Sequence, residues 1–267
     1  LLIQIFRLFT QSDVDVGSGY IDKYMRIFKM PEARMMMSSF ANMEGIHQHA
    51  YSLLLDTVGM PETEYKAFAD YEAMADKHDY INNIKVTANN KESIAKALAV
   101  YSGFTEGLQL FSSFVILLNF PRFGKMKGMG QIITYSIRDE SLHVEAMTKL
   151  FREFIQENIE LWTDDFKKEI YQACRDMVAL EDRFLDLVFD QGDIEGLTKK
   201  EMRQYIRYIA DRRLLQLGLK TNYDVNENPL PWLDSVMGVE HQNFFEGRAT
   251  AYMKAGLRGN VEGIQFT

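Results

Sequence analysis

The sequence predicts an all-α fold, a bundle of six or more long helices in one domain over residues 1–267. Apolar residues recur at spacings of three and four through long windows, as in helices with one buried face, and strand patterns are weak. Only 17 glycines and 5 prolines interrupt the chain, and no flexible linker divides it. Because hydrophobic residues make up 46% of the chain, we expect one large core.

The first half of the chain contains five segments of helical periodicity, Leu1–Ser12, Tyr20–Lys29, Pro31–Val58, Glu62–His78 and Lys91–Phe120. The first segment is expected to end at the polar triplet Gln11-Ser12-Asp13. Pro31 suits the first turn of a helix, where its missing N–H leaves no hydrogen bond unmade. Gly59 and Pro121 follow the third and fifth segments and predict where those helices end.

The second half contains four more such segments, Gln131–Asn158, Asp164–Asp190, Lys199–Gly218 and Glu240–Gly256. Gly124–Gly130 is expected to form a turn, and Gln191-Gly192-Asp193 a loop. Thr198 is predicted to cap the helix after it, because its hydroxyl can accept a hydrogen bond from a free backbone N–H. The segment Asn228–Trp232 contains two prolines, so it cannot be helical throughout.

Charge and cysteine content narrow the partners and the compartment. The formal net charge of -8 argues against nucleic acid or an anionic membrane as the main partner. No apolar run reaches the roughly 18 residues of a membrane-spanning helix. The single cysteine, Cys174, allows no intramolecular disulfide and favours a cytoplasmic location. The chain begins at Leu1, with neither Met nor a signal peptide, so we expect it to be truncated at the N-terminus.

Two segments share the pattern Glu-x-x-His, Glu44-Gly-Ile-His47 and Glu140-Ser-Leu-His143. Each lies on a predicted long helix, where positions i and i+3 share one face, so carboxylate and imidazole can reach the same point. Two such pairs, with one carboxylate from each of two further helices, form the ligand set of di-iron and di-manganese bundles. One copy arises often by chance, but only five histidines are present and two of them fall in this pattern.

Two further carboxylates complete this candidate ligand set. Glu106 lies in an almost uncharged, apolar helix, where an unpaired carboxylate would be costly to bury. The other is Asp13 or Asp15, at the end of the first helix. Carboxylate oxygens with only two imidazoles suit iron or manganese. The competing interpretation is a set of buried structural ion pairs. The remaining histidines are interpreted as surface or supporting groups, namely His49, His78 and His241.

The sequence resembles the small subunit of class I ribonucleotide reductase over nearly the whole chain. The segment Arg138-Asp139-Glu140-Ser-Leu-His143 is similar to the family's Arg-Asp-Glu-x-x-His signature, and Glu44–Tyr51 resembles its Glu-x-x-His-x-x-x-Tyr segment. The 34-residue gap from Glu106 to Glu140 matches the family's spacing. So does the 31-residue gap from Asp13 to Glu44, which favours Asp13 over Asp15. Two C-terminal segments match as well, Asn228–Trp232 and Asn243–Arg248.

The resemblance implies a ferritin-like bundle holding two iron ions per chain, with manganese as the alternative metal. One ion would be bound by Asp13, Glu44 and His47. The other would be bound by Glu106, Glu140 and His143, with Glu44 and Glu140 able to bridge the two ions. Tyr51, one helical turn beyond His47, would be oxidised to a stable tyrosyl radical. Its apolar pocket is predicted to include Leu110, Phe114 and Ile137.

The resemblance also implies a path for the radical to leave the subunit. Asp139 would hydrogen-bond the metal-binding imidazole of His47 and fix its tautomer. Tyr252 matches the tyrosine that hands the radical to the large subunit, although a plain surface tyrosine is the alternative. The family's relay tryptophan precedes the first metal ligand, whereas Trp162 and Trp232 both lie downstream and do not match it.

The predicted function is that of an enzyme subunit that lends an oxidising equivalent to a separate large catalytic subunit, which reduces ribonucleoside diphosphates. No nucleotide-binding loop occurs in the sequence, in agreement with a substrate site on another chain. We also expect a homodimer. One alternative is a related di-metal oxidase or monooxygenase, although such an enzyme needs neither Tyr51 nor Tyr252. The other is a non-enzymatic, ferritin-like metal-binding bundle, which metal stoichiometry would distinguish.

Overall fold

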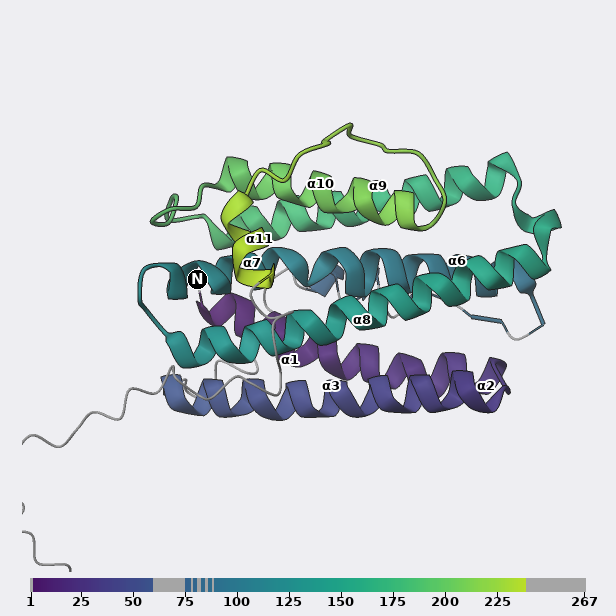
Figure 1. Cartoon of the computed structure of the whole chain (residues 1–267), viewed down its shortest axis with the longest axis horizontal. Coiled ribbons are helices and arrows are strands. Elements are labelled where there is room, and N and C mark those ends of the chain that lie inside the picture. The colour runs from purple at the N-terminus through teal and green to yellow at the C-terminus, as the bar shows by residue number, and fades with distance from the viewer. Residues whose placement is uncertain are drawn as a thin grey trace, which may run out of the picture. The chain divides into compact units, whose positions relative to one another are not determined.

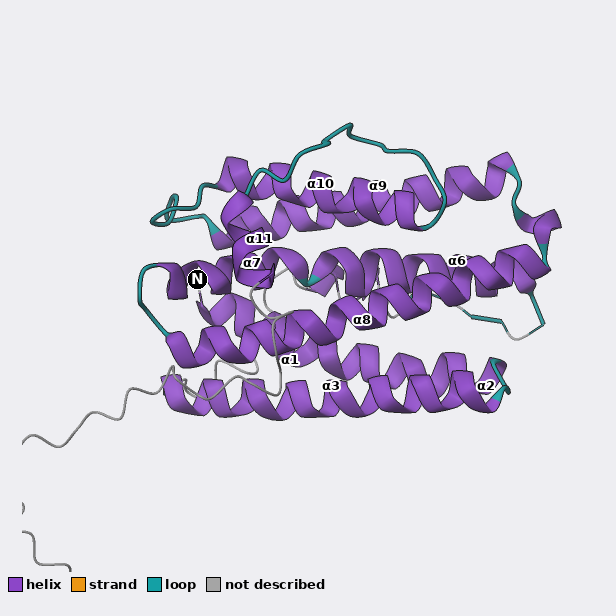
Figure 2. Ribbon diagram, in the orientation of Figure 1, coloured by secondary structure: helices purple, strands orange, loops and turns teal. Residues whose placement is uncertain are grey.

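The computed structural model describes residues 2–59, 75–77, 79–80, 83–84, 86–87 and 89–238. Over these residues the secondary structure is helical and contains no strand, apart from one isolated bridge between Ile194 and Leu197 (Figure 2). The all-α prediction is therefore confirmed. In the same part of the chain, no helix is long and apolar enough to cross a membrane.

The N-terminal part of the chain forms two long, paired helical runs. Helix α1 (Leu2–Gly19) continues directly into a π-helix, η1 (Tyr20–Tyr24), and a short turn, α2 (Met25–Ile27). Helix α3 (Pro31–Val58) follows and packs along α1, as Figure 1 shows. It begins at Pro31 and ends at Gly59, whose φ of 75° is the left-handed conformation that glycine adopts most easily.

The central helices carry a second π-helical segment. Helix α6 (Lys91–Val100) leads into the π-helix η3 (Tyr101–Gln109) and then into α7 (Phe111–Arg122). The sequence predicts this run as one helix ending at Pro121, but Pro121 lies inside its last turn. Helix α8 (Lys127–Glu157) begins four residues earlier than expected, so the predicted turn over residues 124–130 is shorter.

The remaining helices lie close to their predicted bounds. A 3-10 turn, η4 (Ile159–Leu161), precedes α9 (Asp164–Val188), and α10 (Lys199–Gln216) follows. Thr198 caps α10 as predicted, in a capping box with Glu201. A short helix, α11 (Pro231–Gly238), begins inside the proline-containing segment, which is therefore not helical throughout.

Helix α1 corrects one expectation, because it runs through Gln11-Ser12-Asp13 instead of ending there. The side chains of Ser12 and Asp13 are buried, at 4% and 2% exposure. A cluster of polar residues often marks a helix end, where backbone groups without a helical partner are exposed to solvent. Here the side chains of Ser12 and Asp13 lie in the interior, and the helix continues past them.

The chain divides into two units, Leu1–Pro231 and Trp232–Thr267. Within the first unit, α1 packs on α3, η3 packs on α8 and α10, α7 packs on α8, and α9 packs on α10. Glutamates and histidines on α3, η3 and α8 thereby come within reach of one another. The single domain predicted over residues 1–267 stays a prediction, and the predicted segments Glu62–His78 and Glu240–Gly256 lie mostly or wholly outside the described residues.

Candidate metal centre

Six candidate ligands converge in the interior of the bundle from four elements. Helix α1 supplies Asp13, α3 supplies Glu44 and His47, η3 supplies Glu106, and α8 supplies Glu140 and His143. All six residues are buried, with no more than 4% exposure. Ligand atoms in two overlapping groups lie within 4.8 Å of one another: Asp13, Glu44 and His47 in one group, and Glu44, Glu106, Glu140 and His143 in the other.

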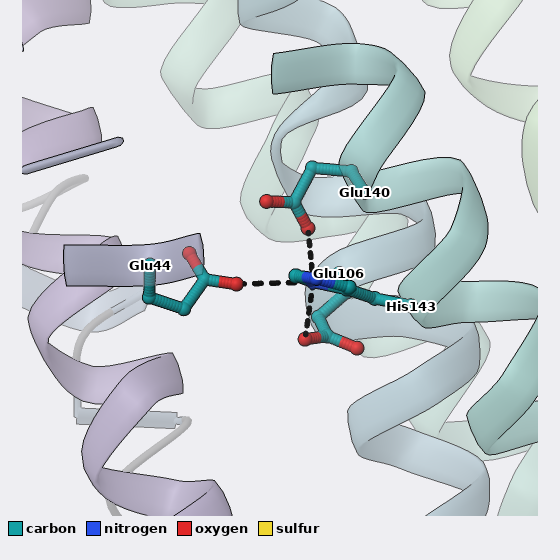
Figure 3. A group of neighbouring side chains, drawn as sticks. All are labelled: Glu44, Glu106, Glu140 and His143. Carbon is teal, nitrogen blue, oxygen red and sulfur yellow. Dashed lines mark ion pairs between the residues drawn. The ribbon is translucent and has the colours of Figure 1, made fainter. Parts of the chain in front are cut away.

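His143 lies at the centre of the larger group (Figure 3). Its Nδ1 atom is 3.1 Å from Glu44 Oε1, 3.7 Å from Glu106 Oε1 and 3.7 Å from Glu140 Oε2. Figure 3 shows the three carboxylates turned toward this one nitrogen. The opposite ring nitrogen, Nε2, is 3.3 Å from the thioether sulfur of Met43. Nδ1 is thus the nitrogen that would bind a metal.

His47 has the same orientation but a different supporting partner. Its Nδ1 atom is 3.4 Å from Glu44 Oε2 and 3.4 Å from Glu140 Oε1. Its Nε2 atom is 3.3 Å from Asp139 Oδ2, at the edge of the cluster, where the Asp139 side chain is 21% exposed. A carboxylate in this position fixes which imidazole nitrogen carries the proton and leaves the other free to bind a metal.

Glu44 and Glu140 each face both imidazoles through different oxygens. In Glu44, Oε2 faces His47 and Oε1 faces His143. In Glu140, Oε1 faces His47 and Oε2 faces His143. This is the arrangement that two carboxylates need to bridge a pair of metal ions bound beside the two imidazoles.

Asp13, and not Asp15, reaches the cluster. Two residues along an α-helix correspond to a rotation of about 200°, so these side chains lie on nearly opposite faces of α1. Asp13 is buried against Glu44 and His47, whereas Asp15 is only partly buried and its charge acts on Lys23. The structure thus separates the two candidates that the ligand argument alone had left open.

The local backbone of η3 explains how Glu106 enters the cluster. The hydrogen bonds of a π-helix span five residues instead of four, so its side chains are rotated relative to a regular helix and its carbonyls are differently placed. The carbonyl of Gly107 accepts a hydrogen bond from Nε of the buried Arg213, at 2.7 Å. A Cβ at position 107 would lie 2.7 Å from that nitrogen and 2.9 Å from the backbone oxygen of Ser102, so glycine suits this approach.

The electrostatics of the cluster favour cations. Burial raises the pKa of Asp13 and of Glu106 well above the ordinary range. Burial opposes protonation of the imidazoles, yet their carboxylate neighbours raise the pKa of His47 to about 12 and of His143 to about 10. Burial also opposes ionisation of Glu140, but its contacts with the two imidazoles lower its pKa to about 2. Positive charge is therefore strongly stabilised here.

The donor atoms fit a pair of divalent metal ions. Within the part of the chain that the structure describes, several buried ligand atoms accept or donate no hydrogen bond: Asp13 Oδ2, both oxygens of Glu44, Glu106 Oε2, Glu140 Oε2 and His143 Nδ1. Such atoms are costly to bury unless something else binds them. Four ionised carboxylates would carry four negative charges, which two divalent cations would balance, and oxygen-rich sites with two imidazoles suit iron or manganese.

Tyr51 is buried beside this cluster. Its side chain is 1% exposed, and its ring centroid is 6.4 Å from that of His47. Burial and the nearby Asp13 carboxylate raise the pKa of Tyr51 well above its ordinary value, so the phenol holds its proton at neutral pH. The predicted pocket residues are also buried, namely Leu110, Phe114 and Ile137.

Sequence reasoning missed three residues at this site. Phe9 stacks on Tyr51 with ring centroids 4.9 Å apart and also contacts Phe114, at 5.0 Å. Its place four residues before Asp13, on the same helix face, was the available signal. Met43, beside His143, and Tyr20, whose hydroxyl donates to Glu106, gave no comparable signal. Three candidates lie outside the described residues: Tyr252, His78 and His241.

Comparisons with known proteins identify relatives across the chain. The family model described as ribonucleotide reductase, small chain, matches residues 1–229. The chain is 44% identical to the probable ribonucleoside-diphosphate reductase small subunit of Invertebrate iridescent virus 6, over 97% of this chain and 82% of the relative. It is 31% identical to the ribonucleoside-diphosphate reductase subunit beta of Chlamydia pneumoniae, over 93% of this chain and 75% of the relative.

Solved structures share the fold. The ribonucleotide reductase R2 subunit from Clostridium botulinum aligns with a TM-score of 0.79 at 24% identity, over 88% of this chain and 76% of that chain. A dimanganese(II) protein from Streptococcus sanguinis aligns with a TM-score of 0.67 at 20% identity, over 88% and 81%. These likenesses confirm the predicted ferritin-like bundle. The family model and the two sequence relatives together show that the chain belongs to the family of ribonucleotide reductase small chains.

Proposed function

We propose that the chain stores a one-electron oxidising equivalent on Tyr51 and supplies it to the large subunit of a class I ribonucleotide reductase. The observation that carries this proposal is the buried position of Tyr51 beside His47, at the edge of a cluster in which two carboxylates face two imidazoles. Family membership favours this role over a di-metal oxidase or a storage bundle, neither of which the relatives' names indicate.

Two metal ions would be held by the six buried ligands. Asp13, Glu44 and His47 form one group, and Glu106, Glu140 and His143 form the other, with Glu44 and Glu140 shared between the imidazoles. We propose iron, with manganese as the alternative, since a relative of the same fold is described as dimanganese(II). Bound metal would supply the capacity to reduce oxygen. Oxygen is thus the oxidant for the phenol of Tyr51.

The surroundings of Tyr51 suit a long-lived radical. The phenol is protonated, since burial raises its pKa, so forming a neutral radical removes one proton together with one electron. Phe9 stacks on Tyr51 and Phe114 packs on Phe9. We propose that these rings, together with the buried side chains of Leu110 and Ile137, keep water and reductants away from the Tyr51 ring. These side chains would stabilise the radical by excluding water and reductants, because none of the four can donate an electron readily.

Asp139 would act on His47 and not on the substrate. The Oδ2 atom of Asp139 accepts a hydrogen bond from His47 Nε2. The Asp139 side chain is 21% exposed, against 5% for His47. It therefore suits a relay between the buried cluster and the protein surface. From the family resemblance we also propose that Tyr252 passes the radical to the large subunit. The same resemblance leads us to propose that the protein is a homodimer and is located in the cytoplasm.

The proposal is tested by loading the purified protein anaerobically with Fe(II) or Mn(II), adding oxygen, and recording electron paramagnetic resonance spectra. We expect about two metal ions per chain and a tyrosyl radical signal, which Tyr51→Phe abolishes while metal content is unchanged. Tyr205→Phe is the control, since Tyr205 is a buried tyrosine on another helix, α10. A protein that binds metal but forms no radical, or a radical that persists in Tyr51→Phe, would contradict the assignment.

A further inference from the structure

A second tyrosine, Tyr20, contacts the metal centre directly. Its side chain is fully buried, and its hydroxyl donates a hydrogen bond to Oε1 of Glu106. The ring packs edge-on against His143, at 6.0 Å between centroids, and against Phe40, at 5.6 Å. Tyr20 thus contacts one candidate ligand by a hydrogen bond and a second by ring packing, whereas Tyr51 lies beside His47.

The backbone around Tyr20 is arranged in an unusual way. Tyr20 is the first residue of the π-helix η1, directly after Gly19. The hydroxyl of Tyr101 donates to the carbonyl of Val16, at 2.8 Å, at the point where α1 gives way to η1. A Cβ at position 19 would overlap the Tyr101 hydroxyl, so Gly19 permits this approach. The change in helical register then turns Tyr20 toward the cluster.

The two π-helices are linked to each other at this place. Tyr101 is the first residue of η3, the π-helix that carries Glu106. One link runs from Tyr101 on η3 to the end of α1, and the other runs from Tyr20 on η1 to Glu106 on η3. Single π-helical turns occur preferentially at functional sites, because they place side chains where a regular helix would not.

We propose that Tyr20 is a positioning residue for Glu106, which it holds so that this carboxylate binds the second metal ion through one oxygen. A carboxylate can bind a metal through one oxygen or through both. The Tyr20 hydroxyl occupies Oε1 and restricts rotation of the carboxylate, while Oε2 is buried with no hydrogen bond among the described residues. The inference rests on the proposed function, because it requires a metal beside Glu106.

Tyr24 provides the matched comparison within the same π-helix. Its side chain is also fully buried, but its hydroxyl donates to the backbone carbonyl of Ala97, at 3.0 Å, and not to a candidate ligand. Tyr20→Phe and Tyr24→Phe therefore each remove one buried hydroxyl and one hydrogen bond. Only the first variant frees a carboxylate of the metal centre, so a difference between them reports on positioning and not on packing.

The experiment is a Mn(II) titration of both variants and the unmodified protein, with free and bound metal counted by electron paramagnetic resonance. In Tyr20→Phe we expect one of the two ions to bind roughly 10–100-fold more weakly and the spectrum of bound Mn(II) to change, as for other partners that orient metal ligands. The other ion keeps its affinity, and Tyr24→Phe matches the unmodified protein in both measurements.

The outcomes separate this inference from the proposed function. If the unmodified protein binds two ions and Tyr20→Phe gives the same affinities and spectrum, the inference fails while the metal centre stands. If the unmodified protein binds no metal, both fail. Should Tyr20→Phe not fold, fluorotyrosine placed at position 20 keeps the hydroxyl. The ¹⁹F resonance of this probe should shift when Zn(II) is added. The same probe at position 24 should show no shift. Equal responses at both positions would overturn the inference.

Discussion

At the scale of single residues, the two imidazoles of the metal centre differ in what supports them. His47 Nε2 faces the carboxylate of Asp139, whereas His143 Nε2 faces the thioether of Met43. A carboxylate is a strong hydrogen-bond acceptor and a thioether a weak one. His47 is therefore held in one orientation by a charged partner, while His143 depends mainly on the packing around it.

This difference predicts unequal effects of two substitutions. Asp139→Asn removes the charge that supports His47, and we expect metal affinity at the Asp13–Glu44–His47 group to fall about 10–100-fold. Met43→Leu removes only a weak hydrogen-bond acceptor, and leucine is similar in size to methionine. We expect metal affinity to change less than about threefold. Mn(II) titration measures both. Equal losses in the two variants would show that Asp139 has no special role in supporting His47.

At the scale of elements, the junction between α1 and η1 depends on the absence of a side chain at Gly19. Tyr101 approaches the backbone there so closely that an added methyl group would overlap its hydroxyl. Gly45 on α3 offers the opposite case, because nothing lies within 4 Å of the place where its Cβ would be. Two glycines on adjacent helices thus differ in whether a methyl group can be tolerated.

We expect Gly19→Ala to lower the free energy of unfolding by about 1–3 kcal/mol, because Tyr101 must move away from the Val16 carbonyl. Gly45→Ala should instead raise the free energy of unfolding by about 0.5–1 kcal/mol, since alanine favours a helix interior. Urea denaturation followed by circular dichroism measures both. A neutral or stabilising Gly19→Ala would mean that the η1 junction does not depend on this close approach.

At the scale of the whole molecule, we expect metal binding and folding to be coupled. The six candidate ligands lie on four elements and are spread in sequence from Asp13 to His143. A metal can therefore find its full ligand set only in the folded chain. Anything that binds the folded chain alone stabilises it, by about 2.7 kcal/mol when its concentration is 100 times its dissociation constant. Metal should therefore raise the Tm of this protein.

The size of that increase should depend on pH. The pKa is raised to about 12 for His47 and to about 10 for His143, so both imidazoles carry the extra proton of the cationic form at neutral pH. A metal must displace that proton in order to bind. Metal affinity therefore rises with pH, and the Mn(II)-induced increase in Tm should be larger at pH 7.5 than at pH 6.5. Differential scanning calorimetry with and without Mn(II) at each pH measures it.

Glu106→Ala tests the same coupling by removing a ligand. We expect this variant to lose the second metal ion and much of the Mn(II)-induced increase in Tm, whereas Glu157→Ala, which removes an exposed acid of α8, should keep both. A pH-independent increase in Tm, or an unchanged metal content in Glu106→Ala, would contradict the ligand assignment.

The sequence by itself determined several helices and the residue types of the candidate metal centre. Helical periodicity and capping are local properties, so α3, α9 and α10 lie within a few residues of their predicted bounds. The spacing of Glu44 to His47 and of Glu140 to His143 is likewise local, because i and i+3 share a face in any α-helix. A ligand set built from such pairs can be predicted without knowing how the helices pack.

The tertiary structure alone decided how these groups meet. It extends α1 past Ser12 and Asp13, which are buried, places Phe9 on Tyr51, and turns Tyr20 toward Glu106, 86 residues away in sequence. The π-helical turns that carry Tyr20 and Glu106 belong to the same category. Each shifts the hydrogen-bond register of a helix to suit a partner on another helix, and no spacing within one segment contains that information.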